Sequence, residues 1–233
     1  MEKYIKYARV YPSIIAMLLP AILTSLYLEG LLSAYMITFT QSLRILVLFV
    51  PVAVIYAAIG YFLRELFRET SKQLFQFPLF REDETKMPTT RLLLWKDKTL
   101  DDRTKKRIRE KLKKKHGVSL YGQKDEQQKP EEAAKAIVNA VALMRQDTRQ
   151  DPILLQYNYE FGFARNYLGA SVWALLIILA ICITNHFVCR ISISLTWVFF
   201  GIQILLSVIF FFSLKHRGLA YARQLLASFE TLD

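Results

Sequence analysis

The side chains best suited to chemistry in this sequence are cations spaced along one predicted helix, residues 99–117. Arg103, Lys106 and Arg109 recur every three residues, so they share one face of that helix. A narrow apolar stripe occupies another face: Leu100, Ile108 and Leu112. A basic face of this kind can bind the phosphates of a nucleic acid. A solvated or lipid-facing basic helix is the alternative, because acidic residues four positions away already balance part of the charge.

The ends of this helix carry local signals. We expect Thr99 to cap it, with Asp101 and Asp102 in its first turn, and Gly117 to end it in the left-handed conformation. Together with Asp97, these two aspartates also raise the possibility of a metal site. First-turn carboxylates that interact with the helix dipole are the preferred interpretation, so we predict no metal here.

The sequence carries no recognisable catalytic motif. Its three histidines, His116, His186 and His216, are far apart, and neither H-E-x-x-H nor G-x-S-x-G nor a phosphate-binding glycine loop occurs. Cys182 and Cys189 lack the C-x-x-C spacing of a redox or metal motif, and we interpret them as packing residues. We therefore predict that the protein is not an enzyme and uses no cofactor.

The distribution of charged residues along the chain indicates which parts of the protein hold these cations. The chain has 233 residues, is 53% hydrophobic and has a net charge of +11. Most of its Lys and Arg residues lie in one segment, Arg64–Asn166, between two apolar blocks, Val10–Leu63 and Tyr167–Leu214. A basic balance favours polyanionic partners such as nucleic acid or anionic lipid, and in a membrane protein it also reflects the positive-inside bias.

Four apolar stretches are long enough to cross, or nearly cross, a bilayer: Pro12–Leu28, Leu43–Leu63, Tyr167–Phe187 and Ile193–Leu214. The first follows a basic N-terminus, as in a signal peptide, but no clear cleavage site follows it, so an uncleaved transmembrane helix is preferred. Lys and Arg are dense at both termini and in the central segment, and sparse in the two short turns. The positive-inside rule then predicts cytoplasmic termini and a cytosolic insert.

The predicted fold is therefore mainly α, a polytopic membrane protein with four transmembrane helices in two hairpins. Residues 1–63 form the first hairpin, 64–166 a cytosolic ligand-binding or regulatory domain, and 167–233 the second hairpin with a short cytosolic tail. The lipid bilayer is accordingly one expected partner.

We expect the insert to consist of helices, with or without one short strand. Residues 64–75 extend the second span as a helix until Pro78 stops it, and Thr89–Trp95 reads as a strand. Gly122–Lys129 reads as a polar linker. Pro130 then opens a helix, and another helix begins at Asp151-Pro152 and runs into the third span.

Two polar side chains, Gln203 and Ser207, lie one turn apart within the fourth predicted span. They are candidates either for lining a pore or, preferably, for contacts between helices. Four spans form a poor pore in a single chain, so conduction would require a homo-oligomer around a shared axis.

Two stretches resemble a known family: PTTRLLLWKD at residues 88–97 and LQYNYEFGFARN at residues 155–166. They are similar to small bacterial membrane proteins with two transmembrane hairpins around a cytosolic domain, encoded beside nucleotidyltransferases. The best-described class of these is the membrane effector of the Hailong anti-phage system. The resemblance covers the insert and the overall layout, about two-thirds of the chain, and its motifs are moderately specific.

The resemblance implies an ion channel in the bacterial inner membrane, assembled from several subunits and acting in anti-phage defence. Such effectors are held closed by a single-stranded, DNA-like oligonucleotide that the partner nucleotidyltransferase makes. Loss of that ligand during infection would open the pore and depolarise the membrane.

The resemblance also implies ligand-binding residues: Arg91, Trp95, Lys96, Asn158, Arg165 and Asn166. We add Arg103, Lys106 and Arg109 from the residues themselves, because phosphate contacts require Arg or Lys. Base stacking favours an aromatic ring such as that of Trp95.

Other function classes remain open. The first alternative is a non-conducting polybasic scaffold that binds anionic lipid. The second is a helper subunit that recruits a soluble partner enzyme through the helix Pro130–Met144, with Ile137 and Val141 carrying the contact.

Overall fold

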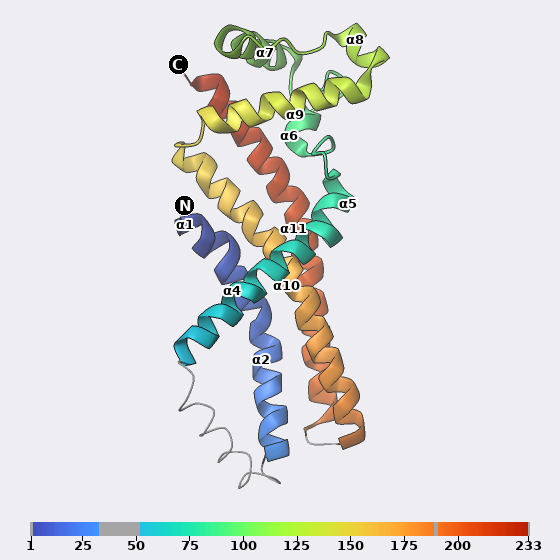
Figure 1. The fold of residues 1–233 in the computed structure, drawn as a ribbon. Helices are drawn as coiled ribbons and strands as arrows, with labels where there is room; N and C mark the ends of the chain where they lie inside the picture. The colour runs from blue at the N-terminus through green and yellow to red at the C-terminus, as the bar shows by residue number, and fades with distance from the viewer. Residues whose placement is uncertain (1, 33–51, 189–190, 233) are drawn as a thin grey trace. The chain divides into compact units, whose positions relative to one another are not determined.

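A computed structural model describes residues 2–32, 52–188 and 191–232 of the protein (Figure 1). The regular secondary structure of these residues is entirely helical. The mainly α fold class predicted from the sequence is therefore confirmed.

The described helices, two of which are π-helical segments labelled η, follow one another in this order: α1 (Glu2–Ile5), η1 (Lys6–Val10), α2 (Tyr11–Leu32), α4 (Val52–Ser71), η2 (Lys72–Gln76), α5 (Phe77–Phe80), α6 (Pro88–Leu93), α7 (Asp102–His116), α8 (Gln123–Gln128), α9 (Pro130–Asp147), α10 (Pro152–Val188) and α11 (Ile193–Thr231).

The chain forms two compact units. Unit 1 takes its described residues from Met1–Lys72 and Phe163–Phe211, and unit 2 takes its residues from Gln73–Gly162 and Phe212–Asp233. The two longest helices, α10 and α11, each contribute residues to both units.

Three of the described helices are long and apolar enough to cross a membrane: Lys3–Leu28, Pro152–Val188 and Ile193–Thr231. They include three of the four predicted spans. The remaining predicted span, Leu43–Leu63, lies partly outside the described residues, so a fourth span and the arrangement in two hairpins stay predictions.

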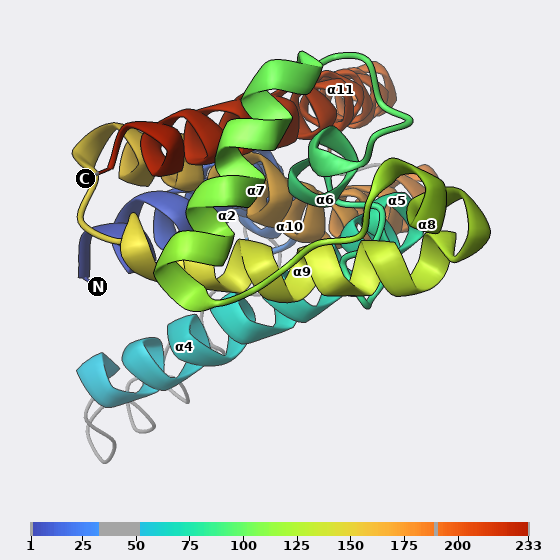
Figure 2. The same ribbon diagram turned by 90° about the horizontal axis from the view of Figure 1, so that it is seen from above.

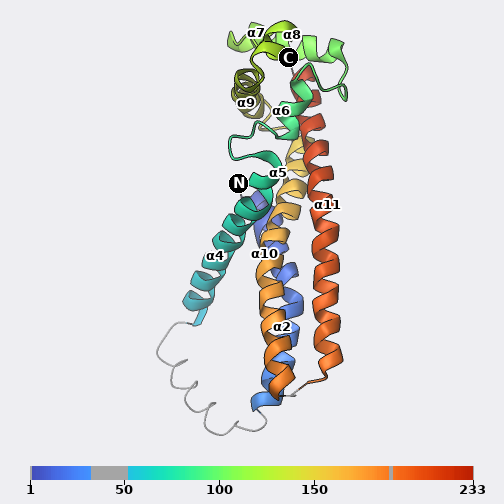
Figure 3. The ribbon, with the colours of Figure 1, turned by 90° about the vertical axis from the view of Figure 1, so that its right-hand side faces the viewer.

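Unit 1 is held together by contacts among α2, α4, α10 and the first part of α11 (Figure 3). The rings of Tyr167 and Phe210 stack with their centroids 4.0 Å apart. The indole Nε1 of Trp173 donates to Thr70 Oγ1 at 2.9 Å. Large apolar side chains are nevertheless exposed, among them Leu205 at 60%. Such an exposed apolar surface fits contact with lipid.

The core of unit 2 lies between α6, α7, α9 and the ends of α10 and α11 that belong to this unit. Figure 2 shows α7 lying across α9 and the C-terminal part of α11. Ile108 and Leu112 of α7 are fully buried, as are Met144 of α9 and Phe229 of α11. The apolar stripe predicted on α7 is thus a core contact.

Several predicted boundaries of the central segment are wrong. Thr89–Trp95 is not a strand, because α6 occupies most of it. Pro88 stands in the first turn of α6, where its fixed φ favours a helix, and a short apolar run does not distinguish strand from helix. Pro78 does not end the helix that contains residues 64–75, since the chain stays helical to Phe80. The predicted linker after Gly122 contains the short helix α8.

The N-terminus of α7 also differs from the prediction. Asp101, not Thr99, caps the helix, and its Oδ1 accepts a hydrogen bond from the Thr104 amide at 2.8 Å. Thr99 lies in the preceding turn, and its backbone amide donates a hydrogen bond to Asp97 Oδ1. The C-terminus is as predicted, because Gly117 ends α7 in the left-handed conformation with φ 69°.

The crossing of α4 and α10 within unit 1 depends on Gly169. A Cβ atom there would lie 2.0 Å from the carbonyl oxygen of Phe67 and 2.6 Å from Cβ of Ser71. We predict that Gly169→Ala separates the two helices and lowers the free energy of unfolding by about 1–3 kcal/mol. Thermal unfolding in detergent, followed by circular dichroism, measures this loss.

The matched control is Gly201→Ala, because a Cβ at Gly201 meets nothing within 4 Å. This variant should be neutral or slightly stabilising, since Ala has the higher helix propensity. Equal stability of both variants would contradict the proposed close approach.

Candidate functional site

Two of the cations predicted on α7 lie where the sequence placed them. Arg103 and Lys106 are exposed on the surface of unit 2. Neither forms an ion pair with another described residue. They therefore remain available to attract an anion on the surface of the helix.

Arg109 was expected on the same exposed face, and this prediction is wrong. Its side chain is only 10% exposed. The guanidinium donates to the carbonyl oxygens of Tyr121 at 2.7 Å and Leu93 at 2.8 Å. It also lies over the ring of Trp95, with Cζ 4.4 Å from the centroid. Arg109 thus holds the segments around α6 and α8 against α7 and is not free to bind a phosphate.

Trp95 is likewise part of the internal structure of unit 2. Its indole Nε1 donates to Tyr121 O at 3.2 Å, and its amide donates to Glu126 Oε1 at 2.8 Å. Glu126 is buried in α8, and its other carboxylate oxygen lies 3.6 Å from Arg109 Nη2. Because Arg109 covers one face of the Trp95 ring, a base can reach only the remaining surface.

Lys105 is a buried cation that the sequence interpretation missed. Its side chain is 0% exposed, and its Nζ donates to the carbonyl oxygens of Leu94, at 2.7 Å, and Asp97. Burial lowers the pKa of this ammonium, although the charges of Asp102 and Asp97 oppose the shift. The signal was present, because Lys105 precedes the buried Ile108 by three residues and so shares its face.

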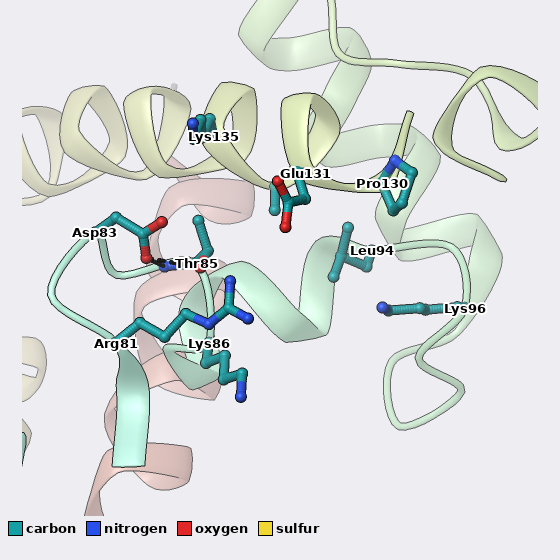
Figure 4. Close-up of a pocket in the computed structure, with 10 residues that line it drawn as sticks. Arg81, Asp83, Thr85, Lys86, Leu94, Lys96, Pro130, Glu131 and Lys135 are labelled. Carbon is teal, nitrogen blue, oxygen red and sulfur yellow. Dashed lines mark hydrogen bonds between the residues drawn. The ribbon is translucent and has the colours of Figure 1, made fainter. Parts of the chain in front are cut away.

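A cavity of about 250 Å³ in unit 2 brings together cations from three parts of the sequence (Figure 4). Its cationic lining residues are Arg81, Lys86, Lys96 and Lys135. Arg81 and Lys96 extend toward each other from opposite sides, and the Glu131 carboxylate points into the same space from α9. None of the four cations forms an ion pair with a described residue. Asp83 and Glu131 line the same cavity and offset part of this charge, but the four cations leave the lining positive overall, which favours an anionic ligand.

The loop that supplies Arg81 to this cavity has a strained backbone. Arg81 and Glu84 have φ values of 60° and 57°, in the region that residues with a Cβ rarely adopt. Surrounding contacts hold the loop: the Thr90 hydroxyl donates to Glu84 O at 3.0 Å, and Arg145 Nη1 lies 3.1 Å from Glu84 Oε2. Strain maintained in this way is common at binding sites.

A second cavity, of about 410 Å³, adjoins the first. Leu94, Lys96 and Pro130 line both cavities, while Trp95 and Glu126 line only the second. An anion held by Lys96 would therefore lie near an aromatic ring. We call the two cavities together the Lys96 site.

Of the nine predicted ligand-binding residues, Trp95 and Lys96 line the Lys96 site. Arg91 is exposed on α6, and its Nε lies 3.2 Å from Asp97 Oδ2. Asn158 is partly exposed on the part of α10 in unit 2. Arg165 and Asn166 belong to unit 1, where Asn166 Nδ2 donates to Ala8 O at 2.5 Å. The nine residues thus do not form a single site within either unit.

The cavity-lining cations that the sequence interpretation missed are Arg81, Lys86 and Lys135. They lie in a charged loop and on the surface of α9, where nothing in their spacing indicates that the fold brings them together.

The polar pair in the fourth predicted span is turned toward protein. Gln203 is fully buried. Its side-chain amide lies next to the Tyr167 hydroxyl, but the distance and angle criteria for a hydrogen bond are not met. The Ser207 hydroxyl donates to Gln203 O at 2.7 Å, within its own helix. In a single chain this arrangement is typical of helix packing.

Two alternative interpretations are also affected by the structure. Ile137 and Val141 are each 1% exposed in the core of unit 2, so they cannot carry contact with a partner enzyme. Asp97 and Asp101, considered for a metal site, accept hydrogen bonds from Thr99 and Thr104. Over the part of the chain that the structure describes, no group of three or more potential metal ligands occurs.

Comparisons with protein families, with characterised proteins and with solved structures find no match for this chain.

We predict that Arg109→Lys lowers the free energy of unfolding by about 1.5–3 kcal/mol, the range for hydrogen bonds made by charged groups. A lysine retains the charge but cannot bond both carbonyls while lying flat on the Trp95 ring. Urea unfolding of the detergent-solubilised protein measures the loss. Arg103→Lys, the same change at an exposed position of the same helix, should stay within about 0.5 kcal/mol of the wild type. Similar losses for both variants would be evidence against a role for Arg109 in holding unit 2.

Asp97 provides a pH test of the turn before α7. Burial raises the pKa of its carboxyl, but hydrogen bonds from Thr99 and the charge of Arg91 outweigh burial, so the pKa lies below its ordinary value. A lowered pKa contributes stability that is present above the unfolded-state pKa and is lost as the pH falls through the folded-state pKa.

We therefore predict that Asp97→Asn is less stable than the wild type by about 1 kcal/mol at neutral pH. The difference should shrink as the pH falls below about 4. Urea unfolding across this pH range tests it, with the exposed Glu82→Gln as control. A difference that does not change with pH would rule out this role of the ionised carboxylate.

Proposed function

We propose that this protein is a homo-oligomeric channel of the bacterial inner membrane, gated by a single-stranded oligonucleotide that binds unit 2. The observation that carries the proposal is the group of four cations that line the first cavity of the Lys96 site without an ion-pair partner among the described residues, while the ring of Trp95 lines the adjoining cavity. Phosphates require Arg or Lys, and bases stack on aromatic rings. The Lys96 site offers both kinds of contact within one unit.

The two adjoining cavities suit consecutive parts of such a ligand. A phosphate would lie between Arg81 and Lys96, with Lys135 adding positive potential. The attached base would lie in the second cavity against the accessible part of Trp95. Glu131, whose carboxylate points into the first cavity and accepts hydrogen bonds when ionised, could bind an amino group of a base. Arg91 and Lys106 would contribute weaker contacts along the exposed surface.

Gating follows from the continuity of the chain. The helices α10 and α11 each contain residues of unit 2 and an apolar stretch long enough to span a membrane. If unit 2 has two arrangements and the ligand binds one of them more tightly, the ligand shifts the equilibrium toward that arrangement. Because α10 and α11 continue into the spans, the arrangement of the spans shifts with it. We propose that bound oligonucleotide keeps the pore closed, and that its loss during phage infection depolarises the membrane.

The remaining parts of the proposal rest on the sequence. Four spans, a cytoplasmic unit 2 and cytoplasmic termini follow from the distribution of Lys and Arg. A nucleotidyltransferase would supply the oligonucleotide, as the resemblance to membrane effectors implies. Defence against phage is the corresponding biological role.

We predict that Lys96→Gln and Arg81→Gln each lower oligonucleotide affinity about tenfold, because each removes one charge-assisted phosphate contact. Each should also reduce the slope of log affinity against log salt by about 0.7. Fluorescence anisotropy of a labelled single-stranded oligonucleotide, titrated with detergent-solubilised protein at several salt concentrations, measures both quantities.

Arg149→Gln is the matched control, because Arg149 is exposed just after α9 and its loss changes the net charge by the same amount. Binding of all three variants that matches the wild type would refute the Lys96 site. Equal weakening by all three would indicate attraction to net charge alone. Binding to vesicles of anionic lipid that Lys96→Gln and Arg81→Gln both weaken, without competition from the oligonucleotide, would favour the polybasic scaffold instead.

A further inference from the structure

Unit 1 brings together four arginines, Arg9, Arg64, Arg68 and Arg165, which we call the arginine cluster. Each lies where a helix changes from charged to apolar sequence: before α2, at the end of the apolar part of α4, and just before Tyr167 in α10. The contacts among them show that these three transitions meet at one place in the unit.

A single carboxylate is shared by three of the four. Glu65 Oε2 lies 2.6 Å from Arg68, and Oε1 lies 3.1 Å from Arg64 and 3.8 Å from Arg9. The three arginine side chains are only 20–28% exposed. Nearby Glu69 Oε1 lies 3.0 Å from Lys72 and 4.0 Å from Arg68, so two carboxylates face the four arginines and Lys72. Positive charge therefore exceeds negative charge in a partly dehydrated place.

Arg165 adds further positive charge. It hydrogen-bonds the Tyr4 hydroxyl, and the charges of Arg9 and Arg68 act on it at close range. Ala8 and Ala164, the residues that precede Arg9 and Arg165, are both fully buried, which indicates that the helices approach closely here. This packing brings the backbones that carry Arg9 and Arg165 close together.

Arg9 also has an unused donor. Its Nε is buried and forms no hydrogen bond with any described residue. Like charges confined in a medium of low dielectric constant repel strongly, and a buried donor without an acceptor costs free energy. Both costs are relieved by an anion with several acceptor oxygens, such as a phosphate.

The surroundings indicate which phosphate is bound. The guanidinium of Arg64 lies over the Tyr61 ring at 4.5 Å, and that of Arg9 over the Tyr4 ring at 5.5 Å. Tyr61 and Phe62, just before Arg64, are more than 60% exposed. Aromatic rings beside arginines, bordering an exposed apolar surface, are typical of the headgroup level of a bilayer.

We propose that the arginine cluster binds the headgroup phosphate of an anionic phospholipid, with the acyl chains lying along the exposed apolar surface of unit 1. This site is separate from the Lys96 site and does not depend on the oligonucleotide proposal. Its occupant would neutralise the excess charge and join α4 to the N-terminal helix and α10.

Two substitutions separate binding from a merely structural role, because they change the charge in opposite directions. Arg9→Gln should lower the affinity for phosphatidylglycerol about tenfold, since one phosphate contact is lost. Glu65→Gln should raise it several-fold, since a competing carboxylate is removed. Purified protein in detergent is titrated with phosphatidylglycerol or phosphatidylcholine, and bound lipid is counted by native mass spectrometry. Circular dichroism confirms folding, and Arg149→Gln serves as the control of equal charge.

A rise for Glu65→Gln with a fall for Arg9→Gln would support the site. If one variant does not fold, the change in phosphatidylglycerol affinity of the other variant decides whether the proposal holds. Equal binding of phosphatidylcholine and phosphatidylglycerol, or unchanged binding of phosphatidylglycerol by the folded variants, would overturn the proposal. Inorganic phosphate is tested in parallel. Displacement of the lipid by millimolar phosphate would identify a site for free phosphate and overturn its assignment to a lipid.

Discussion

The buried guanidinium of Arg109 is the contact on which the rest of unit 2 depends. It satisfies two carbonyl oxygens, covers the Trp95 ring and lies close to the buried carboxylate of Glu126. The same carboxylate accepts hydrogen bonds from the Trp95 and Lys96 amides. The contact between Arg109 and Glu126 therefore fixes the position of Lys96, which lines both cavities of the Lys96 site. Arg109 itself is not available to a ligand.

The cations of the two units differ in how well they are hydrated and in whether they have carboxylate partners. In unit 2 most cations are solvated, and the four that line the first cavity of the Lys96 site have no described carboxylate partner within ion-pair distance. In unit 1 the arginine cluster is only partly hydrated and shares Glu65. The first arrangement suits a soluble polyanion that arrives and leaves, because solvated lysines exchange partners easily. The second suits an anion that stays with the membrane.

Local signals predicted part of this structure, while long-range contacts determined the rest. Pro130 and Gly117 marked helix ends correctly, because a proline in the first turn and a left-handed glycine act within a few residues. Arg109 was assigned to the exposed face, because its helical position cannot reveal that carbonyls from residues 93 and 121 would surround it. Lys105 shares the face of Ile108, yet its charge argued for exposure. Nothing near Arg81 or Lys135 in the sequence indicates that they line one cavity.

The most direct test of this account is the conductance of the purified protein in planar lipid bilayers, with and without a single-stranded oligonucleotide. We expect discrete currents that the oligonucleotide suppresses in the wild type, and suppression that requires a higher oligonucleotide concentration in Lys96→Gln. Currents that the oligonucleotide does not alter would contradict gating through unit 2. No current in either condition, from folded and oligomeric protein, would contradict the channel itself.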